Sequence, residues 1–250
     1  MNLFFSIRHP LRSAILLGLI PIFFAVLSGV ISAVYSLGVS QMLITQTLSF
    51  GISILIGFLL MKKSKLGYQA FGFKGFDFKT NPKVLYFLPL IVAEILPFMN
   101  GFDQSVSLIQ IGLLFLFAAV VGINEELFFR GLMLKVLSIK GVKYAIIVSS
   151  LLFGIGHAFT ALGGSEPLYV VILIIFAGLF GLVCAEIVVM TKSIIPVIIW
   201  HGLHDFIANI TLENINTLSI TILITQTLIL CLYALFLWRK LEFKKIESVA

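Results

Sequence analysis

Long apolar runs are the feature that most restricts how this chain can fold. About eight such runs follow one another, and most have about the 20 residues that an α-helix needs to cross the hydrocarbon core of a bilayer. The mean hydropathy of +1.15 excludes an ordinary soluble domain. The sequence therefore predicts an all-α polytopic membrane protein with about eight transmembrane helices. The runs cover residues 13–34, 40–61, 84–99, 106–137, 144–161, 168–190, 194–210 and 218–238.

Three of the runs need individual interpretation. The third run is short and contains Pro89, Glu94 and Pro97, so we expect its helix to be bent or broken. The fourth run, residues 106–137, is too long for one span, and we expect it to be tilted or to project from the membrane. The first run follows two arginines as a signal peptide does, but its length and the lack of a cleavage site favour an uncleaved helix.

Basic residues occur in alternate gaps between the predicted helices, whereas the opposite gaps carry Asp103, Glu166 and Glu213. By the positive-inside rule, we expect a multi-pass membrane protein whose two termini and loop of residues 62–83 are cytoplasmic. The net charge of +6 therefore indicates anionic lipid headgroups, and not nucleic acid, as the partner of this surface. The basic residues are Arg8, Arg12, Lys62, Lys63, Lys65, Lys74, Lys79, Lys83, Arg130, Lys135, Lys140, Lys143, Lys192, Arg239, Lys240, Lys244 and Lys245.

Several ionisable residues lie inside the apolar runs. A charge near the centre of a bilayer costs about 2.5–3.5 kcal/mol on insertion scales, so such residues usually face a cavity or a partner and mark function. Most of them fall into two short groups, EELFFR at residues 125–130 and HGLHD at residues 201–205. The residues concerned are Glu94, Glu125, Glu126, Arg130, His157, Glu186, His201, His204 and Asp205.

Helical spacing separates the two glutamates of the first group. Glu126 and Arg130 are four residues apart, so they share a helix face and can form an ion pair that lowers the cost of burying both charges. Glu125 is rotated by about 100° from Glu126 and can therefore point elsewhere. In the second group, His201 and Asp205 share a face in the same way.

Depth in the membrane predicts which of these residues meet. Counting about 1.5 Å per residue from the nearest cytoplasmic lysine, Glu125 lies roughly 15–22 Å deep and His157 roughly 21 Å deep. His201 and Asp205 lie roughly 14–20 Å deep by the same count. We therefore expect these residues to form one buried polar site, opening toward the cytoplasm.

The predicted site has the groups that hydrolysis needs. A desolvated carboxylate can take a proton from water as a general base, while one histidine orients the water and others stabilise an oxyanion. Glutamate and histidine are also ordinary zinc ligands, and a bound zinc would activate the water instead. The sequence contains no HExxH motif, which excludes a zincin-type site.

Three motifs carry a family resemblance. EELFFR at residues 125–130, FGIGH at 153–157 and HGLHD at 201–205 resemble the EExxxR, FxxxH and HxxxN/D motifs of the CPBP family of intramembrane proteases. This family includes the type II CAAX prenyl endopeptidases and bacterial Abi-like proteins that process bacteriocins or confer immunity. The resemblance implies an endopeptidase that cleaves hydrophobic or membrane-anchored peptides and proteins.

The resemblance also implies a role for each matching residue. Glu125 is the general base or a metal-linked carboxylate, and His157 helps to bind the catalytic water or a metal. His201 and Asp205 form the group that stabilises the oxyanion. Asp205 departs from the prenyl endopeptidases, which have Asn here, because a carboxylate donates a hydrogen bond only when protonated. Asp205 therefore favours the broader bacterial branch over CAAX cleavage. The resemblance thus implies a multi-pass protein of the bacterial cytoplasmic membrane.

The resemblance makes Glu126 and Arg130 a supporting pair. His204, Glu94 and Glu186 match no motif, and we interpret them as structural hydrogen-bonding residues, with a catalytic or substrate-binding role as the alternative. The expected organisation is helices and a basic loop in residues 1–105, a catalytic core in residues 106–210, and a last helix and cytoplasmic tail in residues 211–250.

Alternatives from other functional classes stay open. A proton-coupled transporter also uses buried glutamate and histidine, but the inverted repeats or paired broken helices typical of transporters are not evident. A catalytically silent membrane immunity or binding protein would keep the same fold. No cofactor is firmly implied, zinc stays open, and we prefer a water activated by Glu125. The expected partners are the lipid bilayer and a hydrophobic substrate, and the oligomeric state is left open.

Overall fold

The structure is a computed structural model that describes residues 3–79, 81–164, 166–212 and 217–241. It is 84% helical, and the described residues contain no β-strand. One isolated antiparallel bridge joins Phe102 to Thr211. The all-α prediction is confirmed. Three of the charged residues used to predict the topology, Glu213, Lys244 and Lys245, lie outside the described residues.

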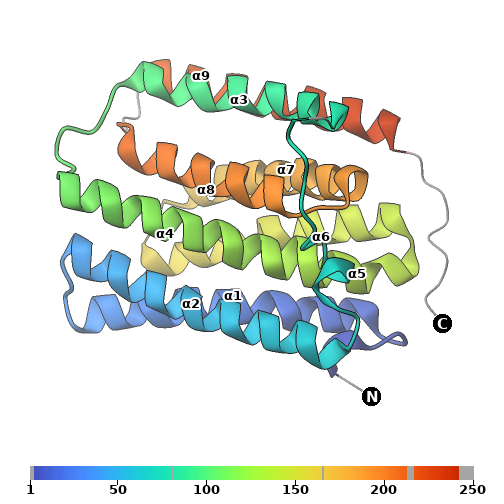
Figure 1. Ribbon diagram of the computed structural model, residues 1–250. Coiled ribbons are helices and arrows are strands. Elements are labelled where there is room, and N and C mark those ends of the chain that lie inside the picture. Colours follow the sequence, from blue (N-terminus) through green and yellow to red (C-terminus); the bar gives the residue numbers. More distant parts are fainter. Residues whose placement is uncertain (1–2, 80, 165, 213–216, 242–250) are drawn as a thin grey trace.

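The helices run roughly side by side in one bundle (Figure 1). Seven helical segments in the described part of the chain are long and apolar enough to cross a membrane. The remaining predicted span is only 16 residues long, and the prediction of about eight transmembrane helices is confirmed. The α-helices are α1 (Pro10–Val34), α2 (Val39–Ser64), α3 (Leu88–Ile95), α4 (Leu108–Glu126), α5 (Leu134–Leu137), α6 (Val142–Gly156), α7 (Pro167–Thr191), α8 (Ile195–Ile210) and α9 (Thr217–Lys240).

The third run is broken as predicted, whereas the expected tilt or projection of the fourth run stays a prediction. The third run is divided into η3 (Pro82–Phe87), the eight-residue α3 and η4 (Leu96–Asn100), with a proline near the start of each piece. The fourth run continues from α4 through the π-helical segment η5 (Leu127–Met133) and α5 into η6 (Ser138–Lys140), as one apolar helical stretch of 33 residues. A π-helical turn is rare and often marks a functional site. Here it contains most of the EELFFR motif.

Two close helix contacts build the centre of the bundle. Glycine allows α4 to approach α8, because a Cβ atom at Gly122 would lie only 2.9 Å from the backbone nitrogen of Gly202. A Cβ atom at Gly154 of α6 would lie 2.7 Å from the carbonyl oxygen of Ile174 in α7. Small residues commonly bring membrane helices together in this way. The first contact holds together the helices that carry EELFFR and HGLHD, and the second holds α6, which ends at the FGIGH motif, against α7.

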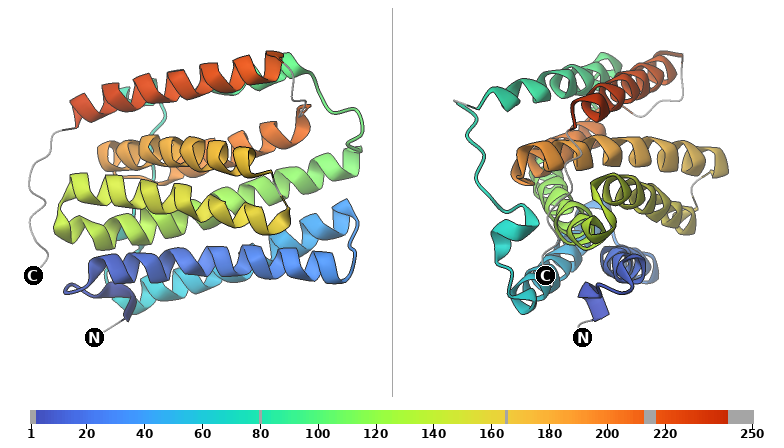
Figure 2. Two further views of the ribbon diagram at one scale, coloured as in Figure 1. Left: turned by 180° about the vertical axis from the view of Figure 1, so that it is seen from behind. Right: turned by 90° about the vertical axis from the view of Figure 1, so that its right-hand side faces the viewer.

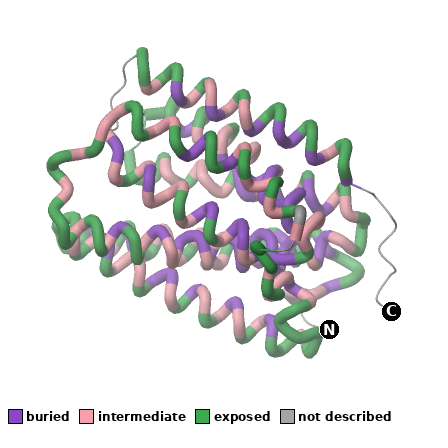
Figure 3. The backbone as a smooth tube through the Cα atoms, turned by 45° about the horizontal axis from the view of Figure 1, so that its top comes forward, coloured by how far each residue is buried: buried purple, intermediate pink, exposed green. Residues whose placement is uncertain are grey.

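The remaining helices flank this centre. Figure 2 shows α1 and α2 on one side and α3 with α9 on the other. Buried residues concentrate toward the interior, whereas the outer helix faces are largely exposed (Figure 3). Many exposed side chains are large and apolar, such as Phe23 at 60% and Leu232 at 67% of their maximal exposure. Such an apolar exterior suits contact with lipid.

Candidate active site

Glu125 and Glu126 end α4, immediately before the π-helical turn of η5. Glu126 is fully buried, whereas the side chain of Glu125 is 21% exposed and lines a cavity. The expectation that the two carboxylates point in different directions is therefore met in the structure. The two neighbouring glutamates therefore have different surroundings: Glu126 lies in the protein core, and Glu125 faces the cavity.

His201 of α8 lies between these two glutamates. Its Nδ1 donates a hydrogen bond of 2.8 Å to Oε1 of Glu126. Its Nε2 lies 3.6 Å from Oε2 of Glu125 and 3.7 Å from Oδ2 of Asp205. A carboxylate bonded to one ring nitrogen fixes both the orientation of a histidine and the position of its other nitrogen. Glu126 therefore directs Nε2 of His201 toward Glu125 and Asp205.

Arg130 forms the predicted ion pair with Glu126. Its Nη1 lies 3.2 Å from Oε1 of Glu126, and its side chain is 1% exposed. The guanidinium group also lies 4.1 Å from the ring centre of Phe153, within the range of a cation–π interaction. A Cβ atom at Gly181 would come within 2.8 Å of Nη2, so this glycine of α7 leaves space for the buried cation.

His157 begins η7 (His157–Gly163), the continuation of α6, and lies at the same cavity as Glu125. Its Nδ1 donates a 3.0 Å hydrogen bond to the carbonyl oxygen of Phe153. Its ring also contacts the ring of Phe153 edge-on, with centroids 4.9 Å apart. These contacts fix the imidazole and leave Nε2 without a protein hydrogen bond among the described residues. His157 is also close enough to Glu125 to interact with it electrostatically.

The cavity beside Glu125 and His157 has a volume of about 770 Å³. Its walls come from α1, α2, α4, η5, α6 and η7, and most of the lining side chains are apolar. The α1 wall reaches Ala33, one residue before the end of that helix, and the η7 wall reaches Gly163. These helix ends lie opposite the ends that carry the lysines. The cavity therefore lies toward the end of the bundle that the predicted topology makes extracytoplasmic, and the expected opening of the site toward the cytoplasm stays a prediction.

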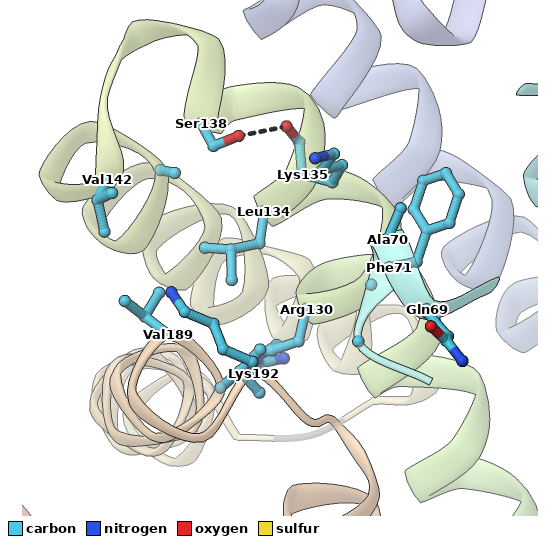
Figure 4. A pocket seen from close by; sticks show the side chains of 14 residues that line it. Gln69, Ala70, Phe71, Arg130, Leu134, Lys135, Ser138, Val142, Val189 and Lys192 are labelled. Atoms are coloured by element: carbon cyan, nitrogen blue, oxygen red, sulfur yellow. Dashed lines mark hydrogen bonds between the residues drawn. The ribbon is translucent and has the colours of Figure 1, made fainter. Parts of the chain in front are cut away.

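A smaller pocket of about 160 Å³ lies toward the lysine-bearing end of the bundle (Figure 4). Arg130, Lys135 and Lys192 line it, but none of the catalytic candidates does. Burial, and to a smaller extent the nearby charge of Lys83, lowers the pKa of Lys192 from its ordinary value.

A second polar cluster joins α3 to α8. The buried carboxylate of Glu94 accepts a 2.8 Å hydrogen bond from Nε1 of Trp200. Nδ1 of His204 lies 3.1 Å and 3.0 Å from the two oxygens of the same carboxylate. The rings of Trp200 and His204 both lie against Phe180, which also contacts His201 edge-on. The interpretation of Glu94 and His204 as hydrogen-bonded structural residues agrees with these contacts.

Glu94→Ala is expected to lower the free energy of unfolding by about 1–3 kcal/mol, because Trp200 and His204 lose a buried acceptor. Thermal unfolding of the purified protein in detergent measures this loss. Glu94→Gln is the matched control, since its amide oxygen still accepts one hydrogen bond, and it should lose less stability. A melting temperature of Glu94→Ala equal to that of the parent would contradict the structural role.

Glu186 differs from the other buried carboxylates. Its side chain in α7 is fully buried, and neither oxygen has a hydrogen-bond partner among the described residues. The interpretation of Glu186 as a hydrogen-bonded residue is therefore not supported by the contacts that the structure describes. Glu186 does not line the cavity beside Glu125.

The arrangement can be compared with the needs of a metal ion. Within the described ranges, no group of three or more His, Cys, Asp or Glu side chains has the arrangement to hold a metal. The nearest such group surrounds Nε2 of His201, where carboxylate oxygens lie 3.6 Å and 3.7 Å away. Zinc ligands normally lie about 2.0–2.3 Å from the metal, in a tetrahedral set. Ligand atoms of such a set lie about 3.3–3.8 Å from one another, so the separations around His201 do not by themselves exclude a metal.

Comparison with known proteins agrees with the motifs. Residues 107–207 match the family model described as type II CAAX prenyl endopeptidase Rce1-like. No curated protein matches the sequence. The matched stretch contains α4 to α8 nearly complete, and with them Glu125, His157, His201 and Asp205. Residues 107–207 of this multi-pass membrane protein are therefore similar to the Rce1-like type II CAAX prenyl endopeptidases.

Proposed function

We propose that the protein is an intramembrane endopeptidase that hydrolyses peptide bonds in hydrophobic or membrane-anchored substrates. The observation that carries the proposal is the position of Glu125, which faces the end of a mostly apolar cavity together with His157. An apolar cavity with a few convergent polar groups is typical of a substrate site. The match to a prenyl endopeptidase family supports the reaction class.

In the proposed reaction, water is held between Glu125 and Nε2 of His157. Glu125 takes a proton from this water, and the oxygen attacks the carbonyl carbon of the scissile peptide bond. The tetrahedral intermediate then carries an oxyanion, which Nε2–H of His201 stabilises in the imidazolium form. Glu125 returns the proton to the leaving amine, so the carboxylate is regenerated when the C–N bond breaks.

Asp205 has a supporting part in this scheme. Its carboxylate lies 3.7 Å from Nε2 of His201, the ring nitrogen that also lies near Glu125. A negative charge at this distance stabilises an imidazolium ion. A carboxylate does not itself donate to an oxyanion unless it is protonated. We therefore assign the donor role to His201 and propose substrates of the broader bacterial branch, such as a bacteriocin or another membrane-associated peptide.

A cleavage assay tests the proposed function. The purified protein is placed in proteoliposomes with a library of fluorogenic peptides that carry a hydrophobic anchor, and an otherwise identical library lacks the anchor. We expect cleavage of a subset of the anchored peptides only. If no peptide is cleaved while the protein still binds anchored peptides, the silent binding alternative replaces the protease.

The same assay gives a prediction for zinc. We expect a zinc chelator to leave the cleavage rate unchanged, because the described side chains provide no three-ligand set at metal-binding distance. Metal analysis of the purified protein and of His157→Ala checks the prediction. One zinc per chain in the parent, lost together with activity in His157→Ala, would show that the reaction uses a metal.

A further inference from the structure

We propose that substrate reaches Glu125 from the end of the bundle opposite the lysine-bearing loops, as an extended hydrophobic segment lying between α1 and η7. The position of the entrance follows from the residues that line the cavity, and the side of the membrane that it faces follows from the charges at the two ends of the bundle. The identity of the occupant as a substrate rests on the proposed function. On the predicted topology, this entrance faces the extracytoplasmic side of the membrane.

The shape of the cavity supports an extended occupant. One wall follows α1 from Pro21 to Ala33, which is about 18 Å of helix. Extended chain rises about 3.3 Å per residue, so this length holds about five residues of peptide. A Cβ atom at Gly156, the residue before His157, would lie 3.5 Å from Cδ1 of Ile22, so His157 lies near the Pro21 end of this wall, and Glu125 is close to His157. A peptide that enters at Ala33 would therefore bring its buried end to the catalytic carboxylate.

The walls favour an apolar segment. Small residues of α1, among them Ala25, Gly29 and Ala33, form much of one side and leave its surface shallow. A Cβ atom added to Gly29 would have no heavy atom within 4 Å, so the space beside it is open. Besides the catalytic residues, only Gln46 and Thr160 are polar among the lining side chains. Burial of apolar groups here is favourable at about 25 cal/mol per Å².

The charges at the two ends of the bundle give the direction. The connections after α1, after η7 and before α4 contain no lysine or arginine, and Asp103 and Glu166 are their charged residues in the described ranges. The connections at the other end contain Lys62, Lys140 and many further basic residues. Because basic loops stay in the cytoplasm, the cavity opens away from it.

Thiol labelling tests the direction without any need for activity. Gly163→Cys and Thr160→Cys place a thiol at the entrance, and Lys140→Cys places one at the opposite end of the bundle. A membrane-impermeant maleimide is added to intact cells, and the parent chain gives the background from Cys184 and Cys231. We expect labelling above background for the two entrance variants in intact cells, and for Lys140→Cys only after the membranes are opened. The reverse pattern would overturn the proposal.

Occlusion of the cavity tests the occupant. Gly29→Trp is expected to abolish most cleavage of anchored peptides, because the indole fills the space between α1 and η7. Gly51→Trp in α2 is the matched control, since a Cβ atom there also meets nothing within 4 Å and Gly51 does not line the cavity. If Gly29→Trp and Gly51→Trp cleave anchored peptides at equal rates, substrate does not reach Glu125 between α1 and η7. Labelling as expected without cleavage by the parent would refute only the proposed function.

Discussion

Glu125→Gln is expected to lower the rate of peptide cleavage by about 10²–10⁴-fold, the usual contribution of a general base. Glutamine keeps the size of the side chain but cannot accept the proton of the attacking water. The fold should be retained, because a neutral amide is less costly to bury than a carboxylate. Rates with anchored fluorogenic peptides and melting temperatures in detergent measure the two effects.

A second polar residue of the same cavity provides the control for this variant. Gln46 lines the cavity from α2 and has no part in the proposed reaction. Gln46→Leu should therefore keep most of the cleavage rate. The base assignment fails if Glu125→Gln remains as active as Gln46→Leu, or if the Glu125→Gln protein is unfolded. Cleavage should also fall at low pH in the parent, where Glu125 becomes protonated, whereas binding of an anchored peptide should persist.

Most of the helices could be predicted because a helix that crosses a membrane needs an apolar run of about 20 residues, which is visible in the sequence. The last run, predicted at residues 218–238, is observed as Thr217–Lys240, and the first, predicted at 13–34, is observed as Pro10–Val34. The π-helical turn of η5 could not be predicted. An extra residue in a helical turn depends on the contacts that the turn makes, and apolar composition contains no information on these contacts.

The catalytic candidates could be grouped by depth, but their partners could not be assigned. Local spacing predicts the pair of Glu126 and Arg130, because both lie on one helix. The hydrogen bond from His201 to Glu126 joins α8 to α4 and depends on how closely the glycines let these helices approach. For the same reason the sequence did not indicate that Glu94 binds Trp200 and His204 across helices. The position of the cavity likewise depends on how helices that are distant in the sequence pack against one another.

Glu126→Ala is expected to destabilise the protein by about 3–5 kcal/mol, the usual cost of breaking a buried ion pair. The variant leaves Arg130 without its anion in the interior and removes the acceptor that orients His201. The expected result is a low yield and a low melting temperature, in contrast to Glu125→Gln. Equal thermal stability of Glu126→Ala and the parent would contradict this assignment.

A double variant separates the two roles of Glu126. Glu126→Leu combined with Arg130→Met removes both buried charges and fills a similar volume, which is often neutral for stability or even favourable. This protein should therefore fold better than Glu126→Ala. Its cleavage rate should nevertheless stay low, because Nδ1 of His201 still lacks the carboxylate that directs Nε2 toward Glu125. Recovery of both folding and cleavage would show that Glu126 serves only to neutralise Arg130.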